Sequence, residues 1–176
     1  MKATDLLQTQ HRTVEALFER LKHGDSDPQS ALEELANSLA AHMAIEQDIF
    51  YPAIRRVAEE LVNESYEEHA LAEVALKRLL TTDPEEEAFK ARLTALKELI
   101  EHHVREEEEE LFPQVEASLE TAALEQLGRS MQQRFDEVFQ SGFEAALPKG
   151  WAKTSADVAK KAVDRKGGKK ASRSAA

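Results

Sequence analysis

One short motif occurs twice in the chain and constrains its fold more than any other feature. His42 is followed four residues later by Glu46. His103, which lies 61 residues beyond His42, is followed by Glu107 at the same spacing. Each copy then reaches an aromatic–proline pair at the same offset: Tyr51-Pro52 and Phe112-Pro113. Residues four apart lie on one face of an α-helix, so each copy presents an imidazole beside a carboxylate. Two such pairs are the components of a two-metal site.

Apolar spacing predicts four amphipathic helices that carry these motifs, over about 4–23, 28–59, 62–81 and 84–118. Short connections make successive helices antiparallel neighbours, so we expect an up-down-up-down four-helix bundle built from two helical pairs. Pro52 is expected to kink or end the second helix. An additional C-terminal helix is predicted over about 121–145. No segment shows the alternation typical of a β-strand, so the predicted fold class is all-α.

Composition supports a single helical domain. The chain has 176 residues, of which 41% are hydrophobic, with only six Gly and five Pro. We assign the bundle to residues 1–147, with the metal-binding core at 4–118, and a basic low-complexity tail to 148–176. The absence of cysteine excludes disulfides, thiolate ligands and iron–sulfur clusters. No transmembrane run or secretory signal is recognised, so the expected location is cytoplasmic.

Charge is divided unevenly between the body and the tail. The whole chain carries a net charge of −11, but residues 149–176 contain nine Lys or Arg and two Asp, a local net of +7. The preceding 148 residues therefore carry −18. We expect the tail to be disordered and solubilising. The alternative is a weak electrostatic arm for nucleic acid, a membrane surface or an acidic partner.

Four histidines fall inside the apolar stripes, one in each predicted helix: His11, His42, His69 and His103. A lone histidine on an apolar face is usually a hydrogen-bonded core residue. Four of them together with two carboxylates are costly to bury, and a bound cation is the simplest compensation. In this interpretation Glu46 and Glu107 bridge two cations, and two histidines cap each one. A buried polar network without metal is the alternative.

The remaining candidate ligands are weaker. Glu73 follows His69 by four residues and is either a ligand or a neighbour of the ligands. His102 points about 100° away from His103 and is expected at the surface or beside the site. The acidic run 106–110 is expected to be mostly solvated surface, and within it only Glu107 has the inward phase.

The ordered set of His11, two His-x-x-x-Glu motifs and His69 resembles the hemerythrin-like, or HHE cation-binding, family. The aromatic–proline continuations are similar to the flanks of that family's motifs, and the resemblance covers about residues 4–118. It implies a four-helix bundle with a non-haem di-iron centre bridged by Glu46 and Glu107. Members bind O2 or NO, sense oxygen or iron, or act in oxidative and nitrosative stress responses. Histidine and carboxylate ligands suit iron or manganese, and zinc is possible.

The chain differs from the oxygen-carrying members at two positions. Those proteins have a second histidine four residues after the third-helix histidine, where this chain has Glu73. Their last carboxylate is an Asp five residues after the final histidine, whereas Glu107 follows His103 by four. We therefore expect a site that reacts with peroxide or NO, or senses iron, rather than one that stores O2. A di-iron enzyme that decomposes peroxide, oxidises ferrous iron or reduces NO is the alternative, as is a structural bundle with another metal or none. Both a monomer and a homodimer remain open.

Overall fold

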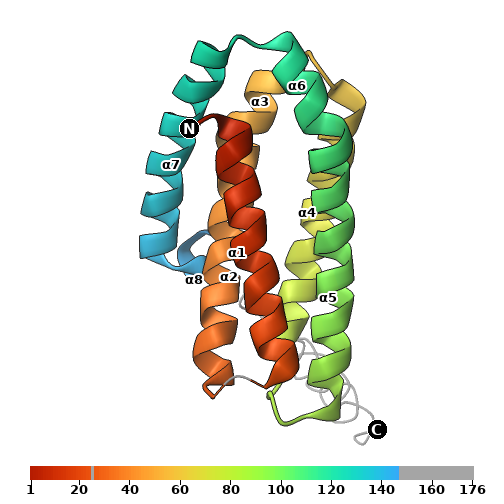
Figure 1. Cartoon of the computed structure of the whole chain (residues 1–176). Helices are drawn as coiled ribbons and strands as arrows, with labels where there is room; N and C mark the ends of the chain where they lie inside the picture. The colour runs from red at the N-terminus through yellow and green to blue at the C-terminus, as the bar shows by residue number, and fades with distance from the viewer. Residues whose placement is uncertain (25, 147–176) are drawn as a thin grey trace, which may run out of the picture. The chain divides into compact units, whose positions relative to one another are not determined.

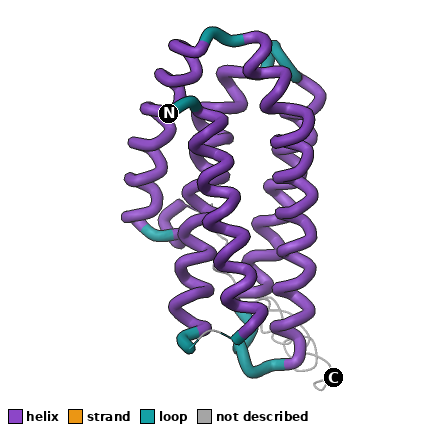
Figure 2. The backbone as a smooth tube through the Cα atoms, viewed as in Figure 1, coloured by secondary structure: helices purple, strands orange, loops and turns teal. Residues whose placement is uncertain are grey.

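The computed structural model describes residues 1–24 and 26–146. The tail predicted for 148–176, with its expected disorder and its nucleic-acid contacts, lies outside the described residues. Within the described ranges the chain is helical and contains no strand (Figure 2). None of the described helices is both long enough and apolar enough to cross a membrane.

Four long helical runs form the bundle, and two of them contain a π-helical turn (Figure 1). In chain order the runs are α1 (Ala3–His23); α2 (Pro28–Ile45), π turn η1 (Glu46–Phe50) and α3 (Tyr51–Ile54); α4 (Glu59–Leu80); and α5 (Glu87–Glu106), π turn η2 (Glu107–Leu111) and α6 (Phe112–Ser118). The bundle therefore consists of two helical hairpins, α1 with α2 and α4 with α5. Two more helices follow the bundle: α7 (Thr121–Ser141) and α8 (Phe143–Ala146).

Local sequence explains where the first hairpin turns. Gly24 ends α1 with a φ of 83°, in the left-handed region that glycine adopts without strain. Asp27 begins α2, because its carboxylate accepts a hydrogen bond of 3.0 Å from the backbone N–H of Ser30. Pro28 occupies the first turn, where no N–H is required.

Helix α7 packs along α1 and α2 (Figure 1). Gly128 permits this close approach, because a Cβ there would lie 2.7 Å from the carbonyl oxygen of Met1. On its inner side, Leu124 and Met131 are buried in an apolar cluster with Tyr51 and Phe112. The additional helix thus covers one end of the bundle core.

The predicted all-α four-helix bundle with a further C-terminal helix is confirmed, and the largest shift of a helix boundary is at the end of the second predicted helix. Pro52 does not end its helix at once: it is the second residue of α3, which continues to Ile54 and stops five residues before the predicted end at 59. A proline ring collides with the carbonyl four residues earlier in a regular α-helix. The wider π turn that precedes both Pro52 and Pro113 accommodates this ring.

Candidate metal centre

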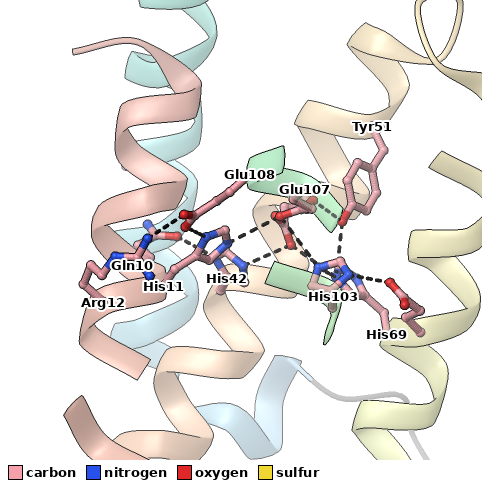
Figure 3. A network of polar contacts seen from close by, with 11 residues as sticks. Gln10, His11, Arg12, His42, Tyr51, His69, His103, Glu107 and Glu108 are labelled. Carbon is pink, nitrogen blue, oxygen red and sulfur yellow. Dashed lines mark hydrogen bonds and ion pairs between the residues drawn. The ribbon is translucent and has the colours of Figure 1, made fainter. Parts of the chain in front are cut away.

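All six predicted ligands belong to two clusters of possible metal ligands inside the bundle, and Figure 3 labels each of them except Glu46. Each is buried, with at most 5% of its surface exposed. They come from all four helical runs: His11 from α1, His42 and Glu46 from α2 and η1, His69 from α4, and His103 and Glu107 from α5 and η2. The helical phase of the two motifs therefore places every one of these side chains inside the core.

The potential ligand atoms divide into two groups, within each of which they lie no more than 4.8 Å apart. The first group consists of four residues: His11, His42, Glu46 and Glu107. The second group consists of three: Glu46, His69 and His103. Glu46 belongs to both groups, as a bridging carboxylate would. Glu107 belongs to the first, but its Oε2 also lies 3.7 Å from Nε2 of His103. Glu73 is half-buried and belongs to neither group.

The atoms at the centre of this arrangement have no hydrogen-bond partner. Among the described residues they include Nε2 of His11, Nε2 of His42, both carboxylate oxygens of Glu46 and Oε2 of Glu107. Each buried polar atom left in this way costs about 1–3 kcal/mol. A cation would compensate all of them at once, so the residues present fit a metal ion.

Carboxylates orient one histidine in each group from the outside (Figure 3). Nδ1 of His11 lies 2.8 Å from Oε1 of Glu108, and Nδ1 of His103 lies 2.7 Å from Oε2 of Glu68. A carboxylate that accepts the Nδ1 proton directs the other ring nitrogen inward and makes it a stronger ligand. Within the run 106–110, which was expected to be mostly solvated, Glu108 contacts the site from outside, and its side chain is only 18% exposed.

Amides contact the other two histidines. Nδ1 of His42 lies 2.9 Å from Oε1 of Gln10, which accepts the Nδ1 proton, and Nδ1 of His69 lies 3.0 Å from the donor Nε2 of Gln47. The four partners occupy equivalent positions in the two hairpins: Gln10 and Glu68 precede a histidine, while Gln47 and Glu108 follow a central glutamate. Each group thus has one histidine held by a carboxylate and one held by an amide.

Tyr51 is a site residue that the helical periodicity does not reveal. Its hydroxyl donates a hydrogen bond of 2.8 Å to Oε1 of Glu107 and lies 3.3 Å from Nε2 of His69. The phenol is fully buried, and burial together with the nearby Glu107 and Glu46 carboxylates raises its pKa well above the usual value. The hydroxyl therefore stays protonated. The equivalent Phe112 has no hydroxyl and instead stacks on an imidazole of the first group.

The π turns explain why Tyr51 reaches the site. In a regular α-helix, residues five apart point about 140° away from each other. In η1 the N–H of Tyr51 instead bonds to the carbonyl of Glu46, five residues earlier, and Phe112 bonds to Glu107 in the same way. The extra residue in each turn brings the aromatic ring to the side of the preceding glutamate. In the sequence, this geometry corresponds to the constant spacing between each glutamate and the aromatic–proline pair that follows it.

The two central carboxylates have pKa values shifted in opposite directions. Burial raises the pKa of Glu46 well above its usual value, and the neighbouring Glu107 raises it further. Burial acts in the same direction on Glu107, but the neighbouring His103 and His11 outweigh it and lower that pKa well below the usual range. The two groups titrate as a pair, and a cation at the centre would favour the charged form of both.

Two of the histidines are held neutral, as metal ligation requires. Burial and then the charge of His11 lower the pKa of His42 well below 6.5. Burial and the charge of His103 lower the pKa of His69 to about 3. Burial also acts to lower the pKa of His103, but its carboxylate neighbours, Glu107 first, raise it overall.

The outer histidine, His102, belongs to a separate surface cluster. Its Nε2 lies 3.3 Å from Oε1 of Glu106 and 3.5 Å from Oε1 of Glu68, and half of its side chain is exposed. Its Nδ1 accepts a hydrogen bond of 2.9 Å from Arg105. His102 therefore lies at the surface, away from both groups.

Comparisons with known proteins agree with this geometry. The model of the family "Hemerythrin HHE cation binding domain" matches residues 2–115. The chain is 29% identical over 130 residues to a DNA nickase of Nostoc sp., in a match that covers 72% of this chain and only 37% of the nickase. It is 25% identical over 156 residues to the uncharacterized protein Rv2633c of Mycobacterium tuberculosis, which covers 86% of this chain and 96% of that protein.

A solved structure of an HHE domain-containing protein is also similar to this chain. The crystal structure of an HHE cation-binding domain-containing protein from Mycobacterium kansasii, a homolog of Rv2633c, superposes with a TM-score of 0.72 at 26% identity. The superposition covers 80% of this chain and 89% of the other. Because the family model matches well over half of the sequence and the buried His/Glu cluster lies within the match, this protein is a metal-binding member of the hemerythrin HHE cation-binding domain family.

Proposed function

We propose that the protein holds a non-haem di-iron centre that binds and reacts with a small molecule in a redox or stress response. The proposed molecule is peroxide or NO in preference to O2. The observation that carries this proposal is the set of unpartnered buried atoms at the centre of the bundle. One iron would be held by the first group and the other by the second, with Glu46 shared. Glu107 is proposed as the second bridging residue, since its Oε2 lies 3.4 Å from His11 and 3.7 Å from His103.

The donor set supports iron. Four imidazoles and two carboxylates, with no thiolate in the chain, are ligands of intermediate hardness that suit non-haem iron, while manganese and zinc are the other candidates. When bound, iron supplies Lewis acidity and redox electrons for the small molecule. Six residues do not complete the coordination of two ions that each prefer about six ligands, so positions remain for that molecule.

The chain's own residues favour chemistry that needs a proton. Tyr51 places a protonated hydroxyl in the core, beside Glu107 and His69, where it can donate to a small molecule bound nearby. The surrounding apolar cluster keeps water away from this end of the site. A proton donor assists the cleavage or reduction of peroxide but is not needed for simple storage of O2. This observation favours the enzyme alternative, peroxide decomposition, as the second candidate function.

Glu73 also favours a reactive site over a site that stores O2. It stands where the oxygen carriers have a histidine, and it lies outside both groups. Burial raises its pKa. The second group therefore has two imidazoles from helices α4 and α5 rather than three, and fewer neutral ligands favour the harder ferric ion. Stable, reversible formation of an oxygen complex would contradict this part of the proposal.

The decisive experiment measures iron content together with the visible spectrum, before and after the addition of azide, peroxide and NO. We expect about two irons per chain in protein expressed with ample iron. His42→Ala and His103→Ala should each lose metal, because each removes an inward-facing Nε2. His102→Ala is the matched control, since it removes a neighbouring imidazole at the surface. Protein without stoichiometric iron, or an equal loss in the control, would overturn the proposal.

The role of the basic segment 149–176 remains a prediction. Its net charge of +7 suits weak contact with nucleic acid, and a relative is named a DNA nickase. Truncation after Pro148, followed by DNA binding at increasing salt, tests this contact. Unchanged DNA binding after truncation would rule out this contact. A cytoplasmic location and a monomeric or homodimeric state are likewise proposed.

A further inference from the structure

A cleft of about 240 Å³ opens between α1 and α5, along the seam where the two helical hairpins meet. Its rim carries charged side chains, among them Arg12, Lys97 and Arg105. Its lining also includes His11 and Glu108, so the cleft reaches the outer edge of the metal centre.

A second, much smaller cavity lies deeper in the bundle. Its volume is about 10 Å³, which is close to the space that one water molecule needs. All four site histidines line it. It shares four wall residues with the outer cleft: His11, Val14, Ile100 and Val104. These four side chains therefore line both spaces, and three of them are aliphatic.

We infer that the cleft between α1 and α5 is the entrance through which small uncharged molecules reach the metal centre, and that Val104 is its gate. This inference rests on the metal centre proposed above, although not on the metal being iron. It assigns a specificity-determining role to an aliphatic side chain that contacts the site without binding the metal.

Burial singles out Val104 among the three aliphatic residues. Val14 and Ile100 are buried, with 3% and 7% of their surfaces exposed, and are fixed by the core. Val104 is only half-buried, so its side chain can move without opening the core. It also follows His103 directly in the chain, at the second group. A rotation of this one side chain is the smallest change that joins the two spaces.

The chemistry of the wall selects uncharged molecules. An ion that crosses Val14, Ile100 and Val104 would lose its hydration without gaining a partner. Two of the cations at the rim offset little of this cost because they are already paired with carboxylates, and the third, Arg105, donates to Nδ1 of His102. Arg12 lies 2.5 Å from Glu108, and Lys97 is bridged by two carboxylates of α1 and α5, Glu19 at 2.5 Å and Glu101 at 3.2 Å. Neutral NO and hydrogen peroxide cross such a wall more readily than azide.

The test compares substitutions at Val104 with the same substitutions at Val74, which is 58% exposed on α4 and lines neither space. The rates of NO and azide binding to metal-loaded protein are followed by stopped-flow absorbance, and metal content is measured for each variant. V104F should slow both rates by at least about tenfold, and V104A should accelerate both, with azide gaining more. V74F and V74A should match the parent protein.

The outcomes separate the gate from the proposed function. Unchanged rates of NO and azide binding in V104A would contradict the role of Val104 as the gate, because this variant widens the wall and leaves the metal ligands in place. Unchanged rates in V104F would contradict it as well, provided that V104F retains its metal. If V104F loses metal, V104A alone decides. If the parent protein does not take up iron, the di-iron proposal fails, and the same rates are then measured on the cobalt(II) form, whose visible bands also report ligand binding.

Discussion

The hydrogen bond from Tyr51 to Glu107 joins the apolar cluster at one end of the bundle to the metal centre. Tyr51→Phe removes only the hydroxyl, which donates to Oε1 of Glu107 over 2.8 Å. The ring itself is retained, and Phe112 shows that phenylalanine fits the equivalent position in the other hairpin. Steric effects should therefore be small, and the measured change should report the lost bond.

The expected magnitude follows from the acceptor. Glu107 is ionised because its pKa lies below the usual range, and a buried hydrogen bond to a charged group contributes about 1.5–3 kcal/mol. For a protein of this size, 1 kcal/mol corresponds to about 2–4 °C in the melting temperature. Tyr51→Phe should therefore lower the melting temperature of the metal-free protein by about 3–12 °C.

Tyr66→Phe is the matched control. Its hydroxyl donates to the neutral carbonyl of Gln47 over 3.3 Å, and the bond is only partly buried. Tyr66→Phe should therefore lower the free energy of unfolding by about 0.5–1.5 kcal/mol. Urea unfolding of both metal-free variants, with the transition slope compared as well as the midpoint, provides the measurement. A Tyr51→Phe protein no less stable than the Tyr66→Phe protein would refute the charged-acceptor argument.

Three further predictions concern the surroundings of the site. Glu108→Ala should weaken metal affinity about 10–100-fold by releasing His11, whereas Glu109→Ala on the exposed face should not; competition with a chelator measures both. Burial lowers the pKa of His69 to about 3, so below about pH 6.5 the unfolded chain takes up a proton there that the folded chain does not. The metal-free protein should therefore lose stability as the pH falls from about 6.5 towards 3, and His69→Gln should flatten that part of the plot of melting temperature against pH. Gly128→Ala should lower the melting temperature despite alanine's better helix propensity, because its Cβ would lie 2.7 Å from a backbone oxygen; a rise would contradict the close packing of α7.

The fold was largely predictable because the apolar stripes and short connections left few alternatives. The helix 84–118 begins at Glu87 and contains η2, and 28–59 ends at Ile54, so the elements were placed correctly while these two boundaries shifted. Both differences have local causes. Turn residues after α4 delay the start of α5, and the π turn with its proline changes the helical course after Glu46.

The burial of the six candidate ligands could be predicted, whereas the residues that support them could not. Each candidate ligand lies on the inward face of its own helix, and the spacing of apolar residues along the sequence indicates that face. The supports act across helices: Gln10 on α1 holds His42 on α2, and Glu68 on α4 holds His103 on α5. Such contacts depend on the rotation of one helix against another, which no single helix encodes. Tyr51 was missed because its phase is not that of an α-helix.

The two π turns also decide how these stretches of the chain can change in length. A regular α-helix of unchanged length after Glu46 would rotate everything beyond it by about 100°. That rotation would withdraw the phenol from the candidate ligands and turn Ile54 out of the core. Loss of one residue between Glu46 and Tyr51, together with a return to regular α-helix, would instead leave the aromatic ring four residues after the glutamate and on the same helix face. The same holds for the stretch from Glu107 to Phe112. The loop at 81–86, by contrast, can gain or lose residues at small cost. Insertions and deletions that arise in this lineage should therefore survive in that loop, whereas the two stretches that separate glutamate from aromatic ring should tolerate only the loss of the one residue that each π turn accommodates.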